Sequence, residues 1–541
     1  MQKSLEMGQI SAAGGFHIFF GRILSTIIMA VGTIVLGGLI LQSDYGLYTI
    51  ALIPATTLML FQDWGVSTAL TRYCARCRET NNFSDLRKII TRTILFQVAI
   101  GVILAALLIL LSPLIAQALF NKPESAFLIA LSSSVILFSA VSASPSSVFV
   151  GFERMKPSII VLLVGALLQS VTAPVLVALG YGALGAVVGY VVGIVASSAI
   201  SIGLLYYLVL RRLPASSSHA PFLPTLKSFL SFGVPYAAAT LVGGLGVQFV
   251  GFMMATYCDT STIGVYKVAT NFMVVSGFFT IPITTMLYPA FSKVDPIKER
   301  SLLNSVFTSS TKYASLLLVP ATLGMIALAD PLISTLYGVK WAQAPLFLSI
   351  LVLSDLLVIF GSLSLPNLLL ALGKTKFLFK TKIVYLVVSV VLGSILIPTF
   401  GMAGVLFVSC ISGAPTVFIC YYYVCKKNNF SAGVRTTVKI LGASLVSFAG
   451  TLLFVFYSPL ASLLNLFVGC LLFVGMLLFA LPSFGAINQT DIETLRIMFR
   501  STGFISKFID VPLLIMQRIM HYLPDFPLKI ADPKKAQKPT S

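Results

Sequence analysis

The stretch Gly46-Leu47-Tyr48-Thr49-Ile50-Ala51 recurs as Gly264-Val265-Tyr266-Lys267-Val268-Ala269, at an offset of 264 − 46 = 218 residues. Each copy opens an apolar segment that is long enough to cross a membrane as a helix. A second pair, Gly182-Ala183-Leu184-Gly185-Ala186 and Gly401-Met402-Ala403-Gly404-Val405, matches at 404 − 185 = 219. These matches at nearly one offset indicate an internal duplication. Each repeat holds six apolar segments, an even number, so the two halves have the same orientation in the membrane, as in parallel-repeat transporters.

About fourteen apolar segments follow one another along the chain, each of roughly the 20 residues that cross a bilayer. We expect them at 13–41, 44–66, 94–119, 126–148, 157–179, 183–210, 228–257, 261–290, 313–336, 344–366, 381–399, 402–425, 436–457 and 459–482. Lys and Arg collect in every second gap between them, and positive charge stays on the cytoplasmic side. The pattern predicts an all-α, multi-pass protein of the plasma (cytoplasmic) membrane with both termini in the cytoplasm.

The composition excludes a soluble protein. Of 541 residues 57% are hydrophobic and only 10% are charged, whereas a soluble domain carries about 25% charged residues. The net charge of +19 comes from cations at the ends of apolar segments rather than on one domain. Charge placed in this way sets topology beside anionic lipid, so we expect no nucleic-acid partner.

The duplication and the gaps predict a domain organisation. Residues 1–212 form an N-terminal lobe of six helices, and residues 228–427 form a C-terminal lobe of six more. A cytoplasmic linker, 213–227, joins the lobes. Two extra helices follow in 428–485, and 486–541 is expected to be a cytoplasmic amphipathic helix with a basic tail.

No motif in the chain is typical of an enzyme. There is no Gly-rich phosphate loop followed by Lys-Ser or Lys-Thr. Cys74 and Cys77 have metal-type spacing, but we interpret them as a chance pair on a cytoplasmic loop, because no second pair or nearby His completes a site. We therefore expect no metal, no cofactor and no catalytic residue.

Arg22, Lys267 and Asp355 are the ionisable side chains within the predicted segments that we single out, because an unpaired charge in a membrane is costly. Arg22 lies about two turns into the first segment from the cytoplasmic side, and Lys267 about two turns into the eighth from the outer side. Two explanations fit each of these residues. The side chain binds substrate, or its charged end extends along the helix to the lipid headgroups. Asp355 lies near the middle of the tenth segment. It is interpreted as a coupling-ion site, an ion-pair partner of Lys267 or a protonated packing residue.

Other polar residues have a structural interpretation first. Asp63 and Arg72 flank the inner end of the second segment, where a gate or a helix-end pair is expected. The amides within segments predict hydrogen bonds between helices. These amides are Gln97, Gln169, Gln248 and Asn271.

The chain resembles the polysaccharide transporter branch of the MOP (multidrug/oligosaccharidyl-lipid/polysaccharide) exporter superfamily. The resemblance is carried by Gly15-Phe16, Gly21-Arg22, Ser43-Asp44-Tyr45-Gly46-Leu47-Tyr48, and Gly65 with Leu70-Thr71-Arg72. It implies a MATE/MOP-like fold with two six-helix lobes around a central cavity, and alternating access. In lipid II flippases, cationic residues of the first and eighth helices hold the diphosphate of the lipid carrier. The resemblance therefore implies that Arg22 and Lys267 hold a (di)phosphate here, where a cation in a low-dielectric cavity suits it.

The implied function is a flippase that moves polyprenyl-(di)phosphate-linked oligosaccharide from the cytoplasmic to the outer leaflet, for envelope polysaccharide or glycoprotein assembly. Its partners would be that substrate, membrane lipids and glycan-assembly enzymes. One alternative is an ion-coupled, MATE-like exporter of small amphipathic molecules, which would depend on Asp355 rather than on Arg22 and Lys267. Another is a membrane-embedded glycosyltransferase or polymerase, which the absence of clustered acidic residues and of a large outer loop disfavours.

Overall fold

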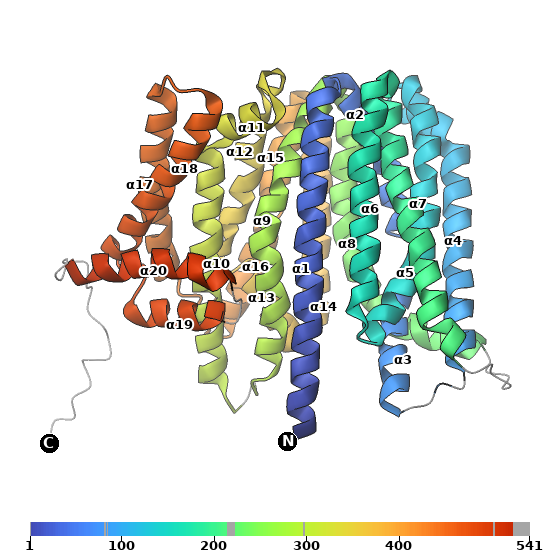
Figure 1. Cartoon of the computed structure of the whole chain (residues 1–541), viewed down its shortest axis with the longest axis horizontal. Helices are drawn as coiled ribbons and strands as arrows, with labels where there is room; N and C mark the ends of the chain where they lie inside the picture. The colour runs from blue at the N-terminus through green and yellow to red at the C-terminus, as the bar shows by residue number, and fades with distance from the viewer. Residues whose placement is uncertain are drawn as a thin grey trace. The chain divides into compact units, whose positions relative to one another are not determined.

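The computed structural model describes residues 2–80, 83, 85–213, 222–295, 298–500 and 504–522. Within these ranges the chain is helical between short turns, and the described part contains no strand (Figure 1). This confirms the predicted all-α fold.

The α-helices of the described ranges are α1 (Gln2–Leu39), α2 (Gln42–Met59), α3 (Val66–Thr80), α4 (Leu86–Leu114), α5 (Ala126–Gly151), α6 (Met155–Leu176), α7 (Gly182–Leu208), α8 (Phe222–Tyr257), α9 (Thr260–Ser292), α10 (Arg300–Ala327), α11 (Ala329–Tyr337), α12 (Ala344–Val352), α13 (Ser364–Ala371), α14 (Thr375–Phe400), α15 (Met402–Ile411), α16 (Ala414–Tyr421), α17 (Val434–Tyr457), α18 (Ser462–Ser483), α19 (Gln489–Arg500) and α20 (Phe504–Tyr522). Short 3₁₀ and π segments are η1 (Ile115–Leu119), η2 (Pro123–Ser125), η3 (Val177–Tyr181), η4 (Leu210–Arg212), η5 (Val339–Trp341), η6 (Leu353–Phe360) and η7 (Tyr422–Lys427).

Many of these helices are suited to cross a bilayer. Nine helical stretches in the described ranges are long and apolar enough, or up to eleven when two bent pairs each count as one crossing. The chain is therefore a multi-pass membrane protein, whereas the number of about fourteen crossings stays a prediction.

Several predicted crossings are broken rather than straight. The second ends at Met59 and resumes as α3, because Trp64 (φ 45°) and Gly65 (φ 79°) adopt left-handed backbone between the two helices. The sequence pattern predicts that residues 67–80 form a cytoplasmic loop. They are helical instead and belong to α3. The α10–α11 pair bends by 67°, and α12–η6 meets α13 at 47° after the left-handed Gly361. Glycine adopts this conformation without the clash that a β-carbon brings.

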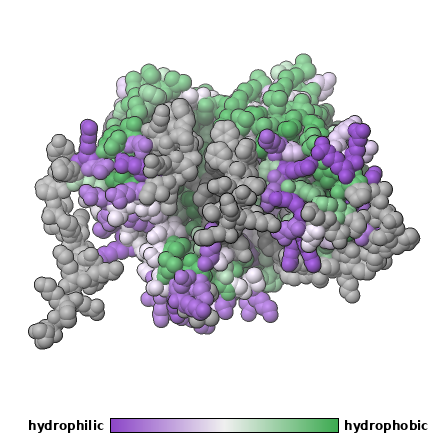
Figure 2. Space-filling view, turned by 60° about the horizontal axis from the view of Figure 1, so that its bottom comes forward, coloured by the Kyte–Doolittle hydropathy of each residue, from purple (hydrophilic) through white to green (hydrophobic). Residues whose placement is uncertain are grey.

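The surface of the helices is apolar and their contacts are rich in small polar residues. Leu110 and Phe456 are 77% and 79% exposed, whereas Ser132, Thr322 and Ser444 are fully buried. Hydrophilic residues gather on the face that is turned forward in Figure 2, while apolar residues cover the parts above it. Apolar side chains that face outward need lipid around them, and small polar residues let membrane helices approach closely.

The chain divides into two compact units. Unit 1 comprises Met1–Val274 and Thr375–Thr416, and unit 2 comprises Val275–Lys374 and Val417–Ser541. In unit 1, α6 packs on both α1 and α7, α4 packs on α5, and α8 packs on α14 (Figure 1). In unit 2, α17 packs on α10 and α18 around a core that includes Val319, Ile440 and Phe473.

The predicted lobe boundaries stay a prediction. Residues 214–221 of the predicted linker, 213–227, lie outside the described residues, and so do residues 523–541, which include the predicted basic tail.

The region predicted as an amphipathic helix forms α19 and α20, which run across the direction of α17 and α18 (Figure 1). Leu513 and Met516 of α20 are buried in the core of unit 2, whereas Val511 and Leu514 are 57% and 49% exposed. A helix with a second, exposed apolar face suits the boundary between headgroups and acyl chains.

Candidate functional site

The two copies of the internal repeat meet each other in unit 1. A β-carbon added at Gly46 of α2 would lie 1.8 Å from the carbonyl oxygen of Thr260 in α9, and one added at Gly264 would lie 2.1 Å from that of Gln42. The contact is reciprocal, because Gln42 and Thr260 are separated by 260 − 42 = 218 residues, the offset between the two glycines. Glycine at both positions lets the two backbones touch.

Lys267 lies on the face of α9 that meets α2. It follows Gly264 by three residues and precedes Asn271 by four, spacings that share one face of a helix. Asn271 Nδ2 donates a hydrogen bond to Tyr45 Oη of α2 at 2.9 Å. Both neighbours of Lys267 along this face therefore contact α2.

The Lys267 side chain is half-buried. The described residues form ion pairs such as Arg78–Glu153, Lys312–Asp491 and Arg496–Asp510, and Lys267 belongs to none of these three. A half-buried ammonium without a carboxylate in a membrane helix is costly unless an anion or water reaches it.

Tyrosines line α2 next to this face. Tyr45 is fully buried and stacks on Tyr48 with 5.8 Å between ring centroids. Tyr48 in turn meets the edge of Tyr190 from α7 at 6.4 Å. Sequence reasoning missed this aromatic row, although the Gly-x-Tyr repeat itself contains Tyr48.

Arg22 belongs to α1, which packs mainly on α6. Gly21, beside it, faces Ile159 of α6 with 2.6 Å between that side chain and an added β-carbon. Arg22 is the next residue along α1, and its side chain is exposed rather than packed against α6. Arg22 and Lys267 share no ion pair or side-chain hydrogen bond among the described residues.

Lys122 binds the end of α8 in unit 1, on the side that the sequence pattern predicts to be outside. Its Nζ donates to the carbonyl oxygens of Ala255 at 2.6 Å and Cys258 at 3.0 Å, where α8 ends. A cation at these carbonyls complements the partial negative charge of the helix end. Burial lowers the pKa of the Lys122 ammonium, although Cys258, Glu124 and Asp259 favour its charged form.

At the opposite end of the second crossing, Asp63 joins a polar network. Its Oδ1 accepts hydrogen bonds from the Ser67 backbone N–H at 2.9 Å and from Gln97 Nε2 at 3.2 Å. Gln97 also donates to Ser67 Oγ at 3.1 Å and accepts from Ser144 Oγ of α5. The network joins α3, α4 and α5. Arg72, predicted with Asp63 to gate, lies exposed on α3.

Interhelical hydrogen bonds confirm the prediction for three of the four amides. Gln97 and Asn271 make the bonds described above, and Gln248 of α8 accepts a bond from Thr57 of α2 at 3.2 Å. The bond predicted for Gln169 stays a prediction.

The Cys74–Cys77 pair is buried on α3 rather than placed on a loop. Burial raises the pKa of the Cys74 thiol to about 12, so it stays protonated at neutral pH. A protonated thiol is a poor metal ligand.

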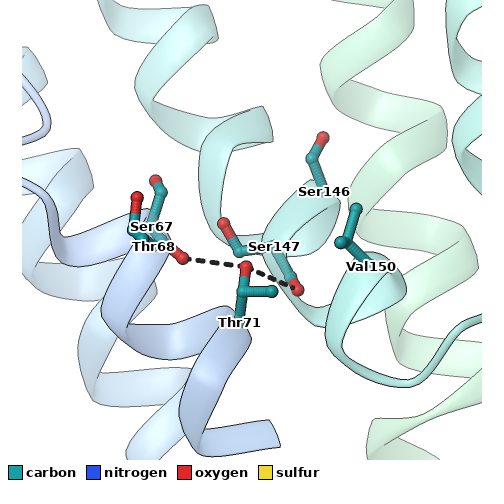
Figure 3. A pocket seen from close by; sticks show the side chains of 6 residues that line it. All are labelled: Ser67, Thr68, Thr71, Ser146, Ser147 and Val150. Atoms are coloured by element: carbon teal, nitrogen blue, oxygen red, sulfur yellow. Dashed lines mark hydrogen bonds between the residues drawn. The ribbon is translucent and has the colours of Figure 1, made fainter. Parts of the chain in front are cut away.

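A pocket of about 370 Å³ opens between α3 and α5, next to the Asp63 network, with which it shares Ser67 (Figure 3). It is lined by Ser67, Thr68, Thr71, Ser146, Ser147 and Val150. Five of the six side chains carry a hydroxyl and none carries a charge. No residue of this pocket except Thr71, which belongs to the family motif, stands out in the sequence.

In unit 2, Asp355 lies within a break in the tenth predicted crossing. It lies in η6, a 3₁₀ segment between α12 and the left-handed Gly361. Ser276 of α9 donates to Asp355 Oδ2 at 2.6 Å, and the Asp355 side chain is half-buried. Lys267 belongs to unit 1 and Asp355 to unit 2, so the predicted ion pair between them stays a prediction.

Comparison with known sequences gives one family match and several relatives. The model of a family described as "Polysaccharide biosynthesis protein" matches residues 35–346. The chain is 28% identical over 200 residues to the teichuronic acid biosynthesis protein TuaB of Bacillus subtilis, covering 36% of this chain and 39% of TuaB. It is 25% identical over 291 residues to a probable low-salt glycan biosynthesis flippase, Agl15, of Haloferax volcanii, covering 51% and 57%. The chain thus spans less than two thirds of either relative.

A longer match joins the chain to the lipopolysaccharide biosynthesis protein WzxC of Escherichia coli, with 25% identity over 367 residues, 67% of this chain and 70% of WzxC. Among solved structures, the lipid II flippase MurJ in an inward closed conformation superposes with a TM-score of 0.68 at 16% identity, over 85% of this chain and 98% of MurJ. An inward-facing MATE family multidrug resistance transporter of the MOP superfamily gives 0.59 at 14%, over 77% and 96%. These likenesses confirm the fold class predicted from the sequence.

Proposed function

Because the chain belongs to the polysaccharide biosynthesis protein family, we propose that it is a flippase for polyprenyl-(di)phosphate-linked oligosaccharide. The direction proposed is from the cytoplasmic to the outer leaflet of the plasma membrane, for envelope polysaccharide or glycoprotein assembly. Agl15 is named as a probable glycan biosynthesis flippase, and TuaB and WzxC are named for glycan assembly, which supports this class of substrate. Both termini are proposed to be cytoplasmic, and glycan-assembly enzymes to be partners.

The main structural support for this proposal is the position of Lys267. Lys267 is a half-buried cation on the α2–α9 contact face, and none of the ion pairs in the described ranges includes it. Charge-assisted hydrogen bonds from an ammonium to phosphate oxygens are strong in a low-dielectric site. A lipid diphosphate would supply the anion that this helix lacks, while its polyprenyl chain stays in the bilayer.

Arg22 is proposed as a second phosphate ligand. The Arg22 side chain is exposed on α1, so a ligand that passes this helix has access to it. Guanidinium presents several N–H groups in a plane, which suits two phosphate oxygens at once. Snorkelling of Arg22 to the headgroups is the competing explanation, and the transport of an Arg22→Gln variant separates the two.

The reciprocal glycine contact supports alternating access. Gly46 and Gly264 bring α2 and α9 together near the ends that the sequence places outside. Two backbones in contact leave no room for a glycan between them, so this contact is proposed to be the outer closure of the transport path. Substrate release outward would require α2 and α9 to separate there.

Asp355 is proposed to couple transport to an ion, and Asp63 and Arg72 to take part in gating on the cytoplasmic side. Asp355 sits in a 3₁₀ break and accepts a hydrogen bond from Ser276. A 3₁₀ stretch in the middle of a helix often marks a functional hinge. This half-buried carboxylate also favours the second candidate function, an ion-coupled exporter of small amphipathic molecules.

Reconstitution into proteoliposomes tests the proposed function. The full chain is incorporated with fluorescent lipid-linked oligosaccharide in one leaflet, and substrate that reaches the other leaflet is scored with a membrane-impermeant glycosidase. We expect transfer well above that of protein-free liposomes. Transfer no faster than in protein-free liposomes, with or without an ion gradient, would contradict the flippase function. Efflux of a cationic dye under the same gradient would then support the exporter.

A further inference from the structure

The hydroxyl-lined pocket between α3 and α5 has a definite hydrogen-bonding character. Thr71 Oγ1 lies between the two helices and shares its one hydrogen between the carbonyl oxygens of Ser67 at 3.0 Å and Ser147 at 3.2 Å (Figure 3). Ser147 Oγ donates to Ala143 O at 3.0 Å, and Ser146 Oγ to Ser142 O at 3.0 Å. A hydroxyl has a single hydrogen and two lone pairs. Three of the five hydroxyls therefore have their hydrogens engaged by backbone and keep only acceptor capacity.

This pattern selects among ligands. A phosphate oxygen only accepts hydrogen bonds, so it finds few donors in a pocket whose hydroxyl hydrogens are engaged. A cation would find no carboxylate among the six lining residues. A neutral polyol donates one hydrogen bond from each of its own hydroxyls, which matches the free lone pairs. Val150, which is exposed, adds an apolar wall that suits the C–H face of a sugar ring.

The two helices that form the pocket are in close contact beside it. Gly151 of α5 lies against α3, where an added β-carbon would lie 2.6 Å from Cys74 Cβ and 2.7 Å from Thr71 O. Next to the pocket, Gln97 joins Asp63 and Ser67 to Ser144. These contacts hold α3 and α5 in one register. A pocket that is preformed binds its ligand without first ordering its own walls.

The pocket is open to the surface on the side of Thr68, Ser146 and Val150, which are exposed. About 370 Å³ is within the roughly 300–1,000 Å³ of small-ligand sites. The pocket and Lys267 belong to the same unit of the structure.

We propose that this pocket binds a neutral sugar ring of the glycan, separately from the cations that bind the (di)phosphate. The proposal rests on the proposed function and deepens it: Lys267 recognises the lipid carrier, and the α3–α5 pocket distinguishes a glycosylated carrier from a bare one. Thr68 and Ser146, both exposed at the pocket, are specificity-determining residues for the sugar.

The test compares the affinity of the full chain in detergent for two kinds of probe by isothermal titration calorimetry. One is farnesyl diphosphate, and the other is farnesyl diphosphate carrying an oligosaccharide of glucose, galactose or N-acetylglucosamine, long enough to reach from Lys267 to the pocket at the opposite end of the second crossing. We expect at least one glycosylated probe to bind roughly tenfold more tightly than the bare one, as two or three added hydrogen bonds would give. Thr68→Val with Ser146→Ala is expected to abolish that difference while binding of farnesyl diphosphate stays unchanged.

Matched controls keep the outcomes separate. Thr80→Val and Ser134→Ala remove hydroxyls from the same two helices outside the pocket, where each donates within its own helix, and should change neither affinity. Two results would contradict sugar binding by the pocket without contradicting the flippase function. One is equal affinity of the wild type for all probes, and the other is a preference for a glycosylated probe that persists in the Thr68→Val, Ser146→Ala variant. Failure of every probe to bind would instead contradict the flippase function and, with it, the pocket.

Discussion

Gly46 of α2 and Thr260 of α9 are in backbone contact, since a β-carbon at Gly46 would lie 1.8 Å from the Thr260 carbonyl oxygen. The repeat-related pair, Gly264 and Gln42, makes the same contact in the opposite sense, at 2.1 Å. The two copies of the repeated segment thus contact each other with local two-fold symmetry. The glycines are retained in both copies of the repeat where the two helices touch.

Gly46→Ala should therefore destabilise the protein. The new methyl group forces α2 from α9 at a backbone contact, and overpacking of this kind costs about 1–3 kcal/mol. We expect a lower melting temperature in detergent, measured by the fluorescence of a thiol-reactive dye. Gly203→Ala is the matched control, because a β-carbon there meets no atom within 4 Å. That change should be neutral or slightly stabilising, since alanine favours a helix over glycine. Equal melting temperatures for Gly46→Ala and wild type would contradict the close contact.

Removal of the Lys122 ammonium should loosen the end of α8. Lys122→Met deletes two hydrogen bonds to the carbonyl oxygens of Ala255 and Cys258. Hydrogen bonds from charged groups contribute about 1.5–3 kcal/mol, so we expect a loss of stability of that order. Hydrogen exchange at the last turn of α8 should rise in Lys122→Met and stay unchanged in Glu124→Gln, an exposed neighbour. Unchanged exchange in both variants would show that Lys122 does not hold this end.

The ion pair that attaches α19 to α10 should behave as a coupled unit. Lys312 Nζ lies 2.5 Å from Asp491 Oδ2, and their side chains are only 17% and 9% exposed. Breaking a buried pair on one side costs about 3–5 kcal/mol, because the other charge stays buried without its partner. Asp491→Asn and Lys312→Met should each destabilise strongly, and the double variant should be less destabilised than the sum of the two.

Thermal unfolding of the two single variants and the double variant completes this cycle. Exact additivity would mean that the two charges do not interact in solution. Arg78→Gln, which removes an exposed partner of Glu153, is the control and should change stability by less than about 1 kcal/mol.

Asp355→Asn should uncouple transport from an ion gradient. The amide keeps the shape of the carboxyl group and a contact with Ser276, but it neither binds a proton nor carries charge. We expect flipping in proteoliposomes to fall to the rate seen without a gradient, whereas Asp330→Asn, at an exposed position of α11, should respond as wild type does. Full stimulation of Asp355→Asn by proton and sodium gradients would exclude a coupling role.

The fold was predictable where it follows from composition and repetition. Alternating basic gaps and the Gly46/Gly264 duplication predict an all-α, multi-pass protein, and the structural likenesses confirm it. The breaks were not predictable. Trp64 adopts left-handed backbone although it is not glycine, and Gly361 does so inside an apolar run that reads as one crossing. Local backbone conformation of this kind depends on tertiary packing, which hydropathy does not report.

The candidate site was predictable only in part. Lys267 stands out in the sequence because a charge within an apolar segment is rare. Ser67 and Ser146 do not, because serine is ordinary in membrane helices and because 146 − 67 = 79 residues separate them along the chain. Only the packing of α3 on α5 brings their hydroxyl groups into one pocket.

Flipping by Lys267 variants tests the central claim most directly. Lys267→Met, Lys267→Arg and wild type are reconstituted with lipid-linked oligosaccharide, beside Lys376→Met, which removes an exposed cation from α14. Loss of a charge-assisted hydrogen bond corresponds to roughly a tenfold to hundredfold effect. We predict that Lys267→Met flips at least tenfold more slowly than wild type, while Lys267→Arg retains most of the rate and Lys376→Met retains all of it. Flipping by Lys267→Met at the wild-type rate would contradict a phosphate-binding role for Lys267.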